Sequence, residues 1–169
     1  MTHYMELLAT NQPWNLIIFM AIPVILAEIV AISELFILFD KKTDGFLRKI
    51  NKVAGIIVGI YFTGIFLYLF STVVIPLTTS NGWRGVADIT AVGFYLLGVF
   101  PLGGIALLEL NLIGRKLSKE SKMKRHAIFV AIFLVVAHVA MIMGMVNPEI
   151  LGWKNKAPVQ MNMNMSNMK

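Results

Sequence analysis

The chain has no cysteine and few charged residues. Of its 169 residues, 14% are Asp, Glu, Lys or Arg, and 57% are hydrophobic. The missing thiols exclude a disulfide scaffold, a cysteine-based metal site and an iron–sulfur cluster. The low charge, with a mean hydropathy of +0.75, excludes most soluble enzymes, because a typical globular chain is about half apolar and about a quarter charged. The composition therefore predicts a protein whose solvent is lipid.

Four apolar stretches are each long enough to cross a bilayer. About 20 apolar residues, rising about 1.5 Å each, span a hydrocarbon core about 30 Å thick. In lipid each backbone polar group must be bonded within its own segment, which favours helices. The expected spans are 15–39, 53–77, 89–114 and 127–146. They predict an all-α integral membrane protein, and the short connections favour one up-down bundle of four transmembrane helices.

The basic residues predict which way this bundle faces. Loops rich in Lys and Arg stay on the cytoplasmic side, and short basic runs between spans argue against nucleic-acid binding. The first connection carries Lys41, Lys42, Arg48, Lys49 and Lys52, and the third carries Arg115, Lys116, Lys119, Lys122, Lys124 and Arg125. Both termini are therefore expected on the outer, periplasmic side. The domains would be an outer N-terminal segment (1–14), the four-helix domain (15–146) and a flexible outer tail (147–169).

Proline and glycine predict where the helices bend and approach one another. Pro23 and Pro101 each remove a backbone donor and crowd the preceding turn, so we expect both to bend their helices. Gly55 and Gly59 form a small-xxx-small pair, which favours close helix contact in membranes. Gly103 and Gly104 suggest a second contact point on the third span.

Three acidic residues inside the spans are candidate functional groups, because ionisable side chains in a membrane are costly and need partners. Glu28 falls near mid-bilayer, so it must be protonated, paired or exposed to a cavity; proton or cation movement and a structural hydrogen bond to a tyrosine are both open. Glu34 and Glu109 share a depth near the cytoplasmic boundary. There they can reach Arg48, Lys52, Arg115 or His126, or extend to the interface.

Methionine and histidine favour a soft metal. His138, Met141 and Met145 form a stripe on the fourth span. Taken alone, this stripe is better explained by a histidine that bonds a neighbouring helix and by methionines that fill space. Thioethers remain ligands in an oxidising compartment and select Cu(I). Further candidate ligands stand in both outer termini, where the tail is otherwise a low-complexity segment: Met1, His3, Met5, Met161, Met163, Met165 and Met168.

Other whole-protein interpretations remain open. A four-helix bundle is a common housing for haem b, but His138 would need a methionine or a partner's ligand as the second axial group. A small ion- or proton-coupled permease would use Glu28, and a structural subunit would only contact a larger complex. No Walker loop, GxGxxG motif or Ser/His/Asp constellation is present, so we expect no catalysis. Copper handling is the first hypothesis, with the lipid bilayer and a homo-oligomer or larger complex as partners.

Residues at and before the start of the first span resemble those of a group of known proteins. The run Asn11-Gln12-Pro13-Trp14-Asn15, followed by Phe19-Met20-Ala21-Ile22-Pro23 and Glu28, is similar to short four-helix bacterial inner-membrane proteins of uncharacterised function that are loosely labelled permeases. The resemblance covers mainly this span. It implies a location in the bacterial inner membrane, and it transfers neither an established activity nor a catalytic residue.

Overall fold

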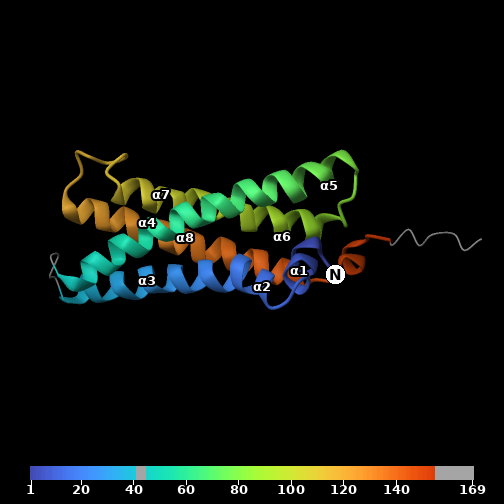
Figure 1. Ribbon diagram of the computed structural model, residues 1–169, viewed down its shortest axis with the longest axis horizontal. Coiled ribbons are helices and arrows are strands. Elements are labelled where there is room, and N and C mark those ends of the chain that lie inside the picture. The colour runs from blue at the N-terminus through green and yellow to red at the C-terminus, as the bar shows by residue number, and fades with distance from the viewer. Residues whose placement is uncertain (41–44, 155–169) are drawn as a thin grey trace, which may run out of the picture.

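The chain folds into four long helices that lie side by side (Figure 1). The computed structural model describes residues 1–40 and 45–154. In chain order the elements are α1 (His3–Ala9), α2 (Trp14–Leu16), the π-helix η1 (Ile17–Ala21), α3 (Ile22–Asp40), α4 (Phe46–Leu69), the π-helix η2 (Phe70–Val74), α5 (Ile75–Thr79), α6 (Val86–Leu97), α7 (Val99–Glu109), α8 (Lys119–Met145) and the 3₁₀ helix η3 (Pro148–Leu151).

The expected four spans are confirmed in number and type. Within the described residues, four helical stretches are long and apolar enough to cross a membrane: Trp14–Phe39, Phe46–Thr79, Val86–Glu109 and Glu120–Met145. Their mean hydropathy lies between 2.0 and 2.6. α4 packs against α3 and α7, while α8 packs against α6 and α7 and more lightly against α3. The chain therefore has the architecture of a multi-pass membrane protein in which neighbouring helices run antiparallel.

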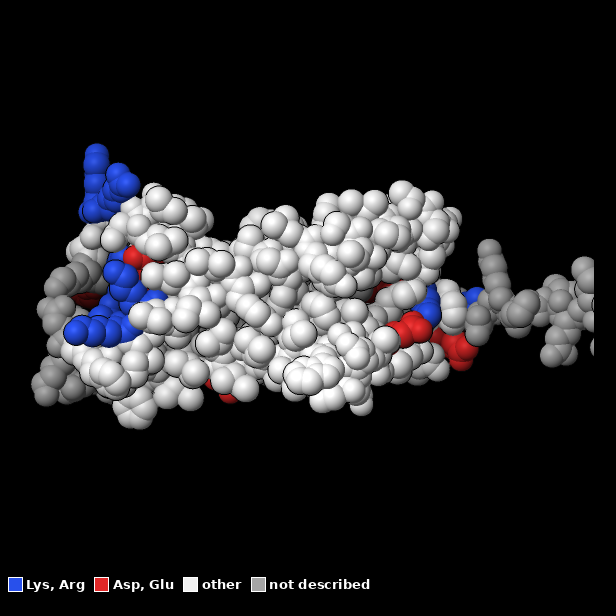
Figure 2. Space-filling model, viewed as in Figure 1, with Lys and Arg blue, Asp and Glu red and all other residues white. Residues whose placement is uncertain are grey.

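The two ends of the bundle differ in charge. The end of α3, the start of α4 and the α7–α8 connection lie at one end, which we call the basic end, and Lys and Arg gather there (Figure 2). α1, η3 and the α5–α6 connection lie at the other end, the terminal end (Figure 1). Between the ends, the face in Figure 2 carries almost no charged side chain, as an apolar solvent requires.

Several helix boundaries differ from the expected spans. α4 begins at Phe46 rather than 53, and α8 begins at Lys119, where the Ser118 side chain caps the helix. The third long helix ends at Glu109 rather than 114, because Asn111 and Gly114 adopt positive φ values of 58° and 76°. Hydropathy marks the part of a helix that suits lipid, and polar turns continue the same helix beyond it.

In the first long helix a π-helix, η1, ends two residues before Pro23. Pro23 has no backbone N–H. It therefore cannot donate to the Phe19 carbonyl, as in an α-helix, or to the Ile18 carbonyl, as in a π-helix. Two tyrosine hydroxyls replace it: Tyr61 donates to the Ile18 carbonyl and Tyr95 to that of Phe19. These two hydrogen bonds tie this part of the first long helix to α4 and α6. In the third long helix the break falls at Gly98, three residues before Pro101.

The glycine pairs divide into close contacts and open positions. A methyl group on Gly59 would lie 2.5 Å from both the Ala106 Cβ and the Leu102 carbonyl oxygen, so α4 and α7 touch there. Gly55 meets Ile105 and Gly104 meets Phe129 at 2.9 Å in the same test. Gly103 has nothing within 4 Å, so its expected role as a packing point is wrong.

The residues before the first span belong to the bundle. Thr2 caps α1 and its hydroxyl donates to the Gly144 carbonyl at 2.6 Å. Tyr4 and Leu8 are buried, and the Tyr4 ring lies 5.1 Å from that of Tyr95. The N-terminal segment therefore contains a helix, α1, that covers the terminal end of the core.

Candidate functional site

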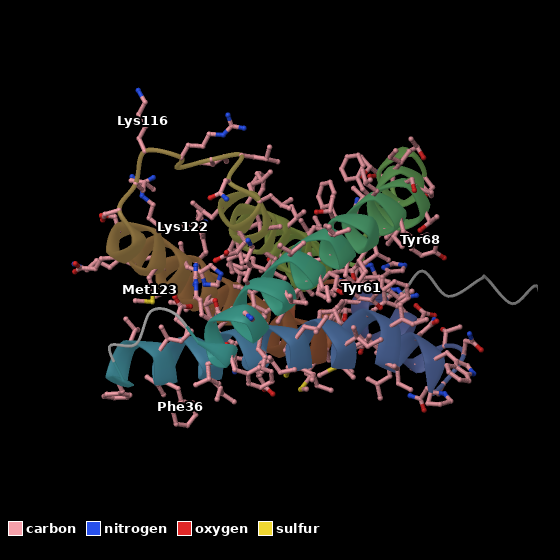
Figure 3. The ribbon with its side chains drawn as sticks, turned by 60° about the vertical axis from the view of Figure 1, so that its left-hand side comes forward. Phe36, Tyr61, Tyr68, Lys116, Lys122 and Met123 are labelled. Carbon is pink, nitrogen blue, oxygen red and sulfur yellow. The ribbon has the colours of Figure 1, made fainter. Side chains whose placement is uncertain are left out.

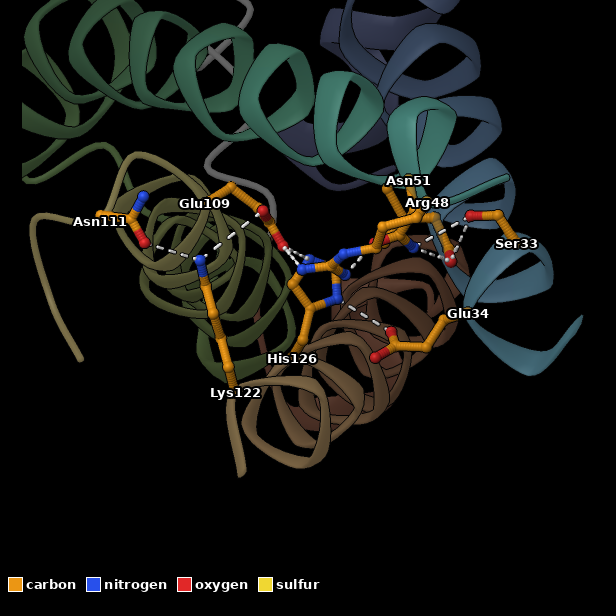
Figure 4. A network of polar contacts seen from close by, with 9 residues as sticks. Ser33, Glu34, Arg48, Asn51, Glu109, Asn111, Lys122 and His126 are labelled. Carbon is orange, nitrogen blue, oxygen red and sulfur yellow. Dashed lines mark hydrogen bonds and ion pairs between the residues drawn. The ribbon is translucent and has the colours of Figure 1, made fainter. Parts of the chain in front are cut away.

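A network of polar side chains lies inside the basic end of the bundle (Figure 4). All four long helices contribute to it. Its members are Ser33 and Glu34 from α3, Arg48 and Asn51 from α4, Glu109 from α7, and Lys122 and His126 from α8. Five of the seven are buried, with exposed fractions between 0% and 4%. We call this group the buried network.

His126 stands at its centre. The ring nitrogen Nδ1 lies 2.9 Å from Glu34 Oε2, and Nε2 lies 3.7 Å from Glu109 Oε1. Both carboxylates come from helices other than α8. Among the described residues, Nε2 of His126 and Oε1 of Glu34 are buried without a hydrogen-bond partner. Such unpaired polar atoms are rare in folded proteins and point to strain, chemistry or an absent water or ion.

Glu109 binds the two cationic side chains of the network. Arg48 donates to Glu109 Oε1 at 2.9 Å, and Lys122 Nζ lies 3.8 Å from Oε2. Lys122 turns toward the bundle and also donates to Asn111 at 3.0 Å, whereas Lys116 points away from the protein (Figure 3). Glu109 thus joins α7 to α4 and α8 through two charged side chains.

Asn51 links the first two long helices beside this centre. Its amide donates to the Ser33 hydroxyl and to the Val30 carbonyl, both at 3.0 Å, and its oxygen accepts from Arg48 at 3.2 Å. Asn51 has no exposed surface. All three of its interactions hold Arg48 and α3 in fixed positions around His126.

Glycine makes the approach of these helices possible. A Cβ on Gly55 would lie 3.3 Å from His126 Nε2 and 3.8 Å from Glu109 Cγ. A side chain there would fill the space between the imidazole and the second carboxylate. The position of Gly55 on α4 therefore opens room next to the unpaired ring nitrogen.

The charges of the buried network balance only when His126 is neutral. Glu34 and Glu109 as carboxylates offset the cations of Arg48 and Lys122. A proton added to His126 or Glu34 gives the cluster a net positive charge in a medium where an uncompensated charge costs several kcal/mol. Because the two groups are in direct contact, one proton can move between them.

Access to the network differs on its two sides. The side chains of Arg48 and Lys122 are 24% and 15% exposed, so they connect Glu109 to the surface of the basic end. About one turn closer to the terminal end, Val130 lies beyond His126 on α8 and Ile105 lies beyond Glu109 on α7, and both are buried. Glu109 thus has partly exposed cations on the side of the basic end and buried apolar side chains on the side of the terminal end.

The sequence-predicted acids fall into two groups. Glu34 and Glu109 lie at one depth and reach His126 and Arg48, which confirms the expected partners. Glu28 is exposed on the outside of α3. Tyr61 and Tyr95, considered as its partners, bond the carbonyls beside Pro23 instead.

The predicted His/Met stripe on α8 is oriented mostly outward. His138 and Met145 are exposed, and His138 Nδ1 contacts the Leu134 carbonyl of its own helix at 2.6 Å. Only Met141 turns inward, to line a small cavity between α3 and α8. These three side chains therefore do not form a continuous row of ligands that leads into the bundle.

The candidate ligands in the N-terminal segment gather at the terminal end. His3 bonds the buried Asp88 twice, through its backbone N–H and through ring Nδ1, both at 2.6 Å. Met1 and His3 line an open polar pocket of about 600 Å³, and Met5 lies against Gly144. Met161, Met163, Met165 and Met168 lie outside the described residues. Within residues 1–40 and 45–154, no three His, Asp or Glu side chains are grouped to hold a metal ion.

Sequence reasoning missed three members of these sites. His126 was considered only as a partner for a nearby acid, and Asn51 and Asp88 were assigned to connections. One signal was available: Arg48 and Asn51 are three residues apart, so on a helix they share a face. The missing step was to continue the helix through the polar residues before the second span.

Comparison with known proteins gives a family without an assigned activity. A family model described as a family of unknown function (DUF6803) matches residues 1–160. No curated protein and no solved structure matches the chain.

Proposed function

The chain belongs to the DUF6803 family, and we propose that it is a proton-linked membrane carrier whose protonatable centre is Glu34, His126 and Glu109. The observation that carries the proposal is a fully buried histidine between carboxylates from two other helices, with a partnerless atom on both His126 and Glu34. Chains of Asp, Glu and His inside membrane bundles are typical of proton relays in pumps and transporters.

The way protonation would act follows from the helices that the centre joins. α3 contacts α8 only lightly, and the Glu34–His126 contact is a polar link between them. A proton added there turns a neutral cluster into a charged one, which changes the balance between these two helices. The π-helices and the break at Gly98 supply places where the long helices can bend. Access from the basic end could then alternate with access from the terminal end.

The proposal includes an orientation and a location. The basic end faces the cytoplasm, both termini face the periplasm, and the protein resides in the bacterial inner membrane. The charge distribution between the two ends supports this orientation, and the resemblance of the first span supports this membrane.

Proton flux in liposomes tests the function. The purified protein is reconstituted with a pH-sensitive dye inside, and a potassium gradient with valinomycin drives protons inward. We expect wild-type vesicles to acidify faster than empty vesicles, and His126→Asn to reduce the excess rate by at least about tenfold, since a positioned proton-transfer group contributes about 10²- to 10⁴-fold.

A matched control is present on the same helix. His138→Asn changes an exposed histidine that contacts only its own backbone, so its flux should equal that of the wild type. Equal flux in wild-type and empty vesicles would overturn the proposal, and so would equal losses in both histidine variants when both fold.

Copper handling is a second proposal for the terminal end. Met1, Met5, Met20, Met141, Met143 and Met145 all lie toward that end, while Met123 alone among the described methionines lies at the basic end. Haem b has less support, because His138 faces outward from a single helix and His126 contacts carboxylates.

A further inference from the structure

A small closed cavity lies near the terminal end, between α1, η1 and α8. Its volume is about 20 Å³, which is enough for one water-sized particle. Aromatic rings form much of its wall, among them those of Tyr4, Phe62 and Tyr95. Two methionines also line it: Met20 from η1 and Met141 from α8.

The lining is poorly suited to water. A buried water needs two to four polar partners. The hydroxyl of Tyr95 already donates to the Phe19 carbonyl, and the remaining wall is almost entirely apolar carbon and sulfur. Such a wall offers soft donors and aromatic faces instead of hydrogen bonds.

We propose that this cavity is a binding site for one Cu(I) ion, held by the thioethers of Met20 and Met141. Neutral sulfur donors from two helices favour a soft monovalent cation over harder divalent ions. Aromatic faces add cation–π attraction in a desolvated space.

A path to this site begins in the polar pocket at the terminal end. Met1 and His3 line that pocket, and Tyr4, the next residue along α1, lies in the wall of the closed cavity. α1 therefore separates the cavity from the outside. An ion that enters from the terminal end passes where Tyr4 now packs against Gly144.

Cu(I) binding by the full-length protein in detergent tests the site. A competing Cu(I) chelator is titrated under reducing, oxygen-free conditions against a background variant in which Met161, Met163, Met165 and Met168 are replaced by Leu. This background removes binding by the tail. We expect the background variant to retain one Cu(I). Adding Met20→Leu and Met141→Leu should weaken Cu(I) binding by more than about 100-fold, because loss of a residue that only supports a metal ligand already lowers metal affinity about 10- to 100-fold.

The control is Met123→Leu, which changes a buried methionine at the basic end. It should leave the affinity unchanged, and X-ray absorption at the copper edge should report sulfur ligands in the background protein. The proposal is overturned if the background binds no Cu(I), or if the Met20 and Met141 variants retain it. Binding is measured without a proton gradient, so it can succeed or fail independently of the proton-linked function.

Discussion

At the scale of single residues, Gly59 sets the distance between α4 and α7. Gly59→Ala places a methyl group 2.5 Å from a backbone oxygen, so the helices must separate. We expect a loss of about 1–3 kcal/mol in stability, the usual cost of overpacking. The matched control is Gly64→Ala on the same helix, where nothing lies within 4 Å. Thermal unfolding in detergent should show a lower midpoint for the first variant, and an equal drop in both would contradict the contact.

Tyr4 is the residue whose ionisation should destabilise the terminal end in alkali. Burial raises the pKa of its hydroxyl to about 12 from the ordinary 10. Above pH 10 the unfolded chain loses this proton while the folded chain keeps it, so unfolding becomes easier up to pH 12. The expected loss reaches about 3 kcal/mol.

Melting midpoints measured across this alkaline range for wild type and Tyr4→Phe test the effect. The variant has no hydroxyl to ionise, so its midpoint should fall less steeply than that of the wild type. Parallel curves would mean that Tyr4 is not protected by burial.

At the scale of elements, a buried carboxylate is one of the groups that hold α1 to the bundle. Asp88 accepts from the backbone N–H of His3 and of Arg84, and it contacts the His3 ring. Asp88→Ala leaves these groups unpaired, which costs about 1.5–3 kcal/mol for each bond to a charged group. Hydrogen exchange over residues 3–9 should therefore accelerate while α8 stays protected. Glu149→Ala, an exposed acid at the same end, should change neither, and unaltered exchange in the Asp88 variant would refute the role.

The long helices were predictable because a bilayer demands length and apolar character, which the sequence displays directly. Hydropathy could not reveal that α4 starts at Phe46, because Arg48 and Asn51 are polar but are accommodated inside the bundle. Hydropathy likewise predicted a span that begins at 89, after Asp88, whereas Asp88 lies in the first turn of α6.

The candidate site was predictable in part. The depth of Glu34 and Glu109 follows from counting residues along straight helices, so their meeting with His126 could be anticipated. Which face of a helix turns inward depends on how four helices pack. Glu28 was singled out by its depth and His138 by its spacing from Met141 and Met145, and their outward orientation is a property of that packing.

At the scale of the whole molecule, the two ends are expected on opposite sides of the membrane. The chain has no cysteine, so a single introduced thiol reports one position. A membrane-impermeant maleimide on intact cells should label Ser80→Cys at the terminal end and leave Lys116→Cys at the basic end unlabelled. Both should react after permeabilisation. Labelling of the second variant in intact cells would invert the orientation.

In the proposed function, His126 and Glu34 share one transported proton. Its test is the initial rate of vesicle acidification for wild type, Glu34→Gln, His126→Asn and the double variant under the same driving force. Groups that act as one unit are strongly non-additive. We therefore predict that each single variant loses the excess flux and that the double variant is no slower than either. Single variants with wild-type rates, or losses that multiply in the double variant, would contradict a shared proton.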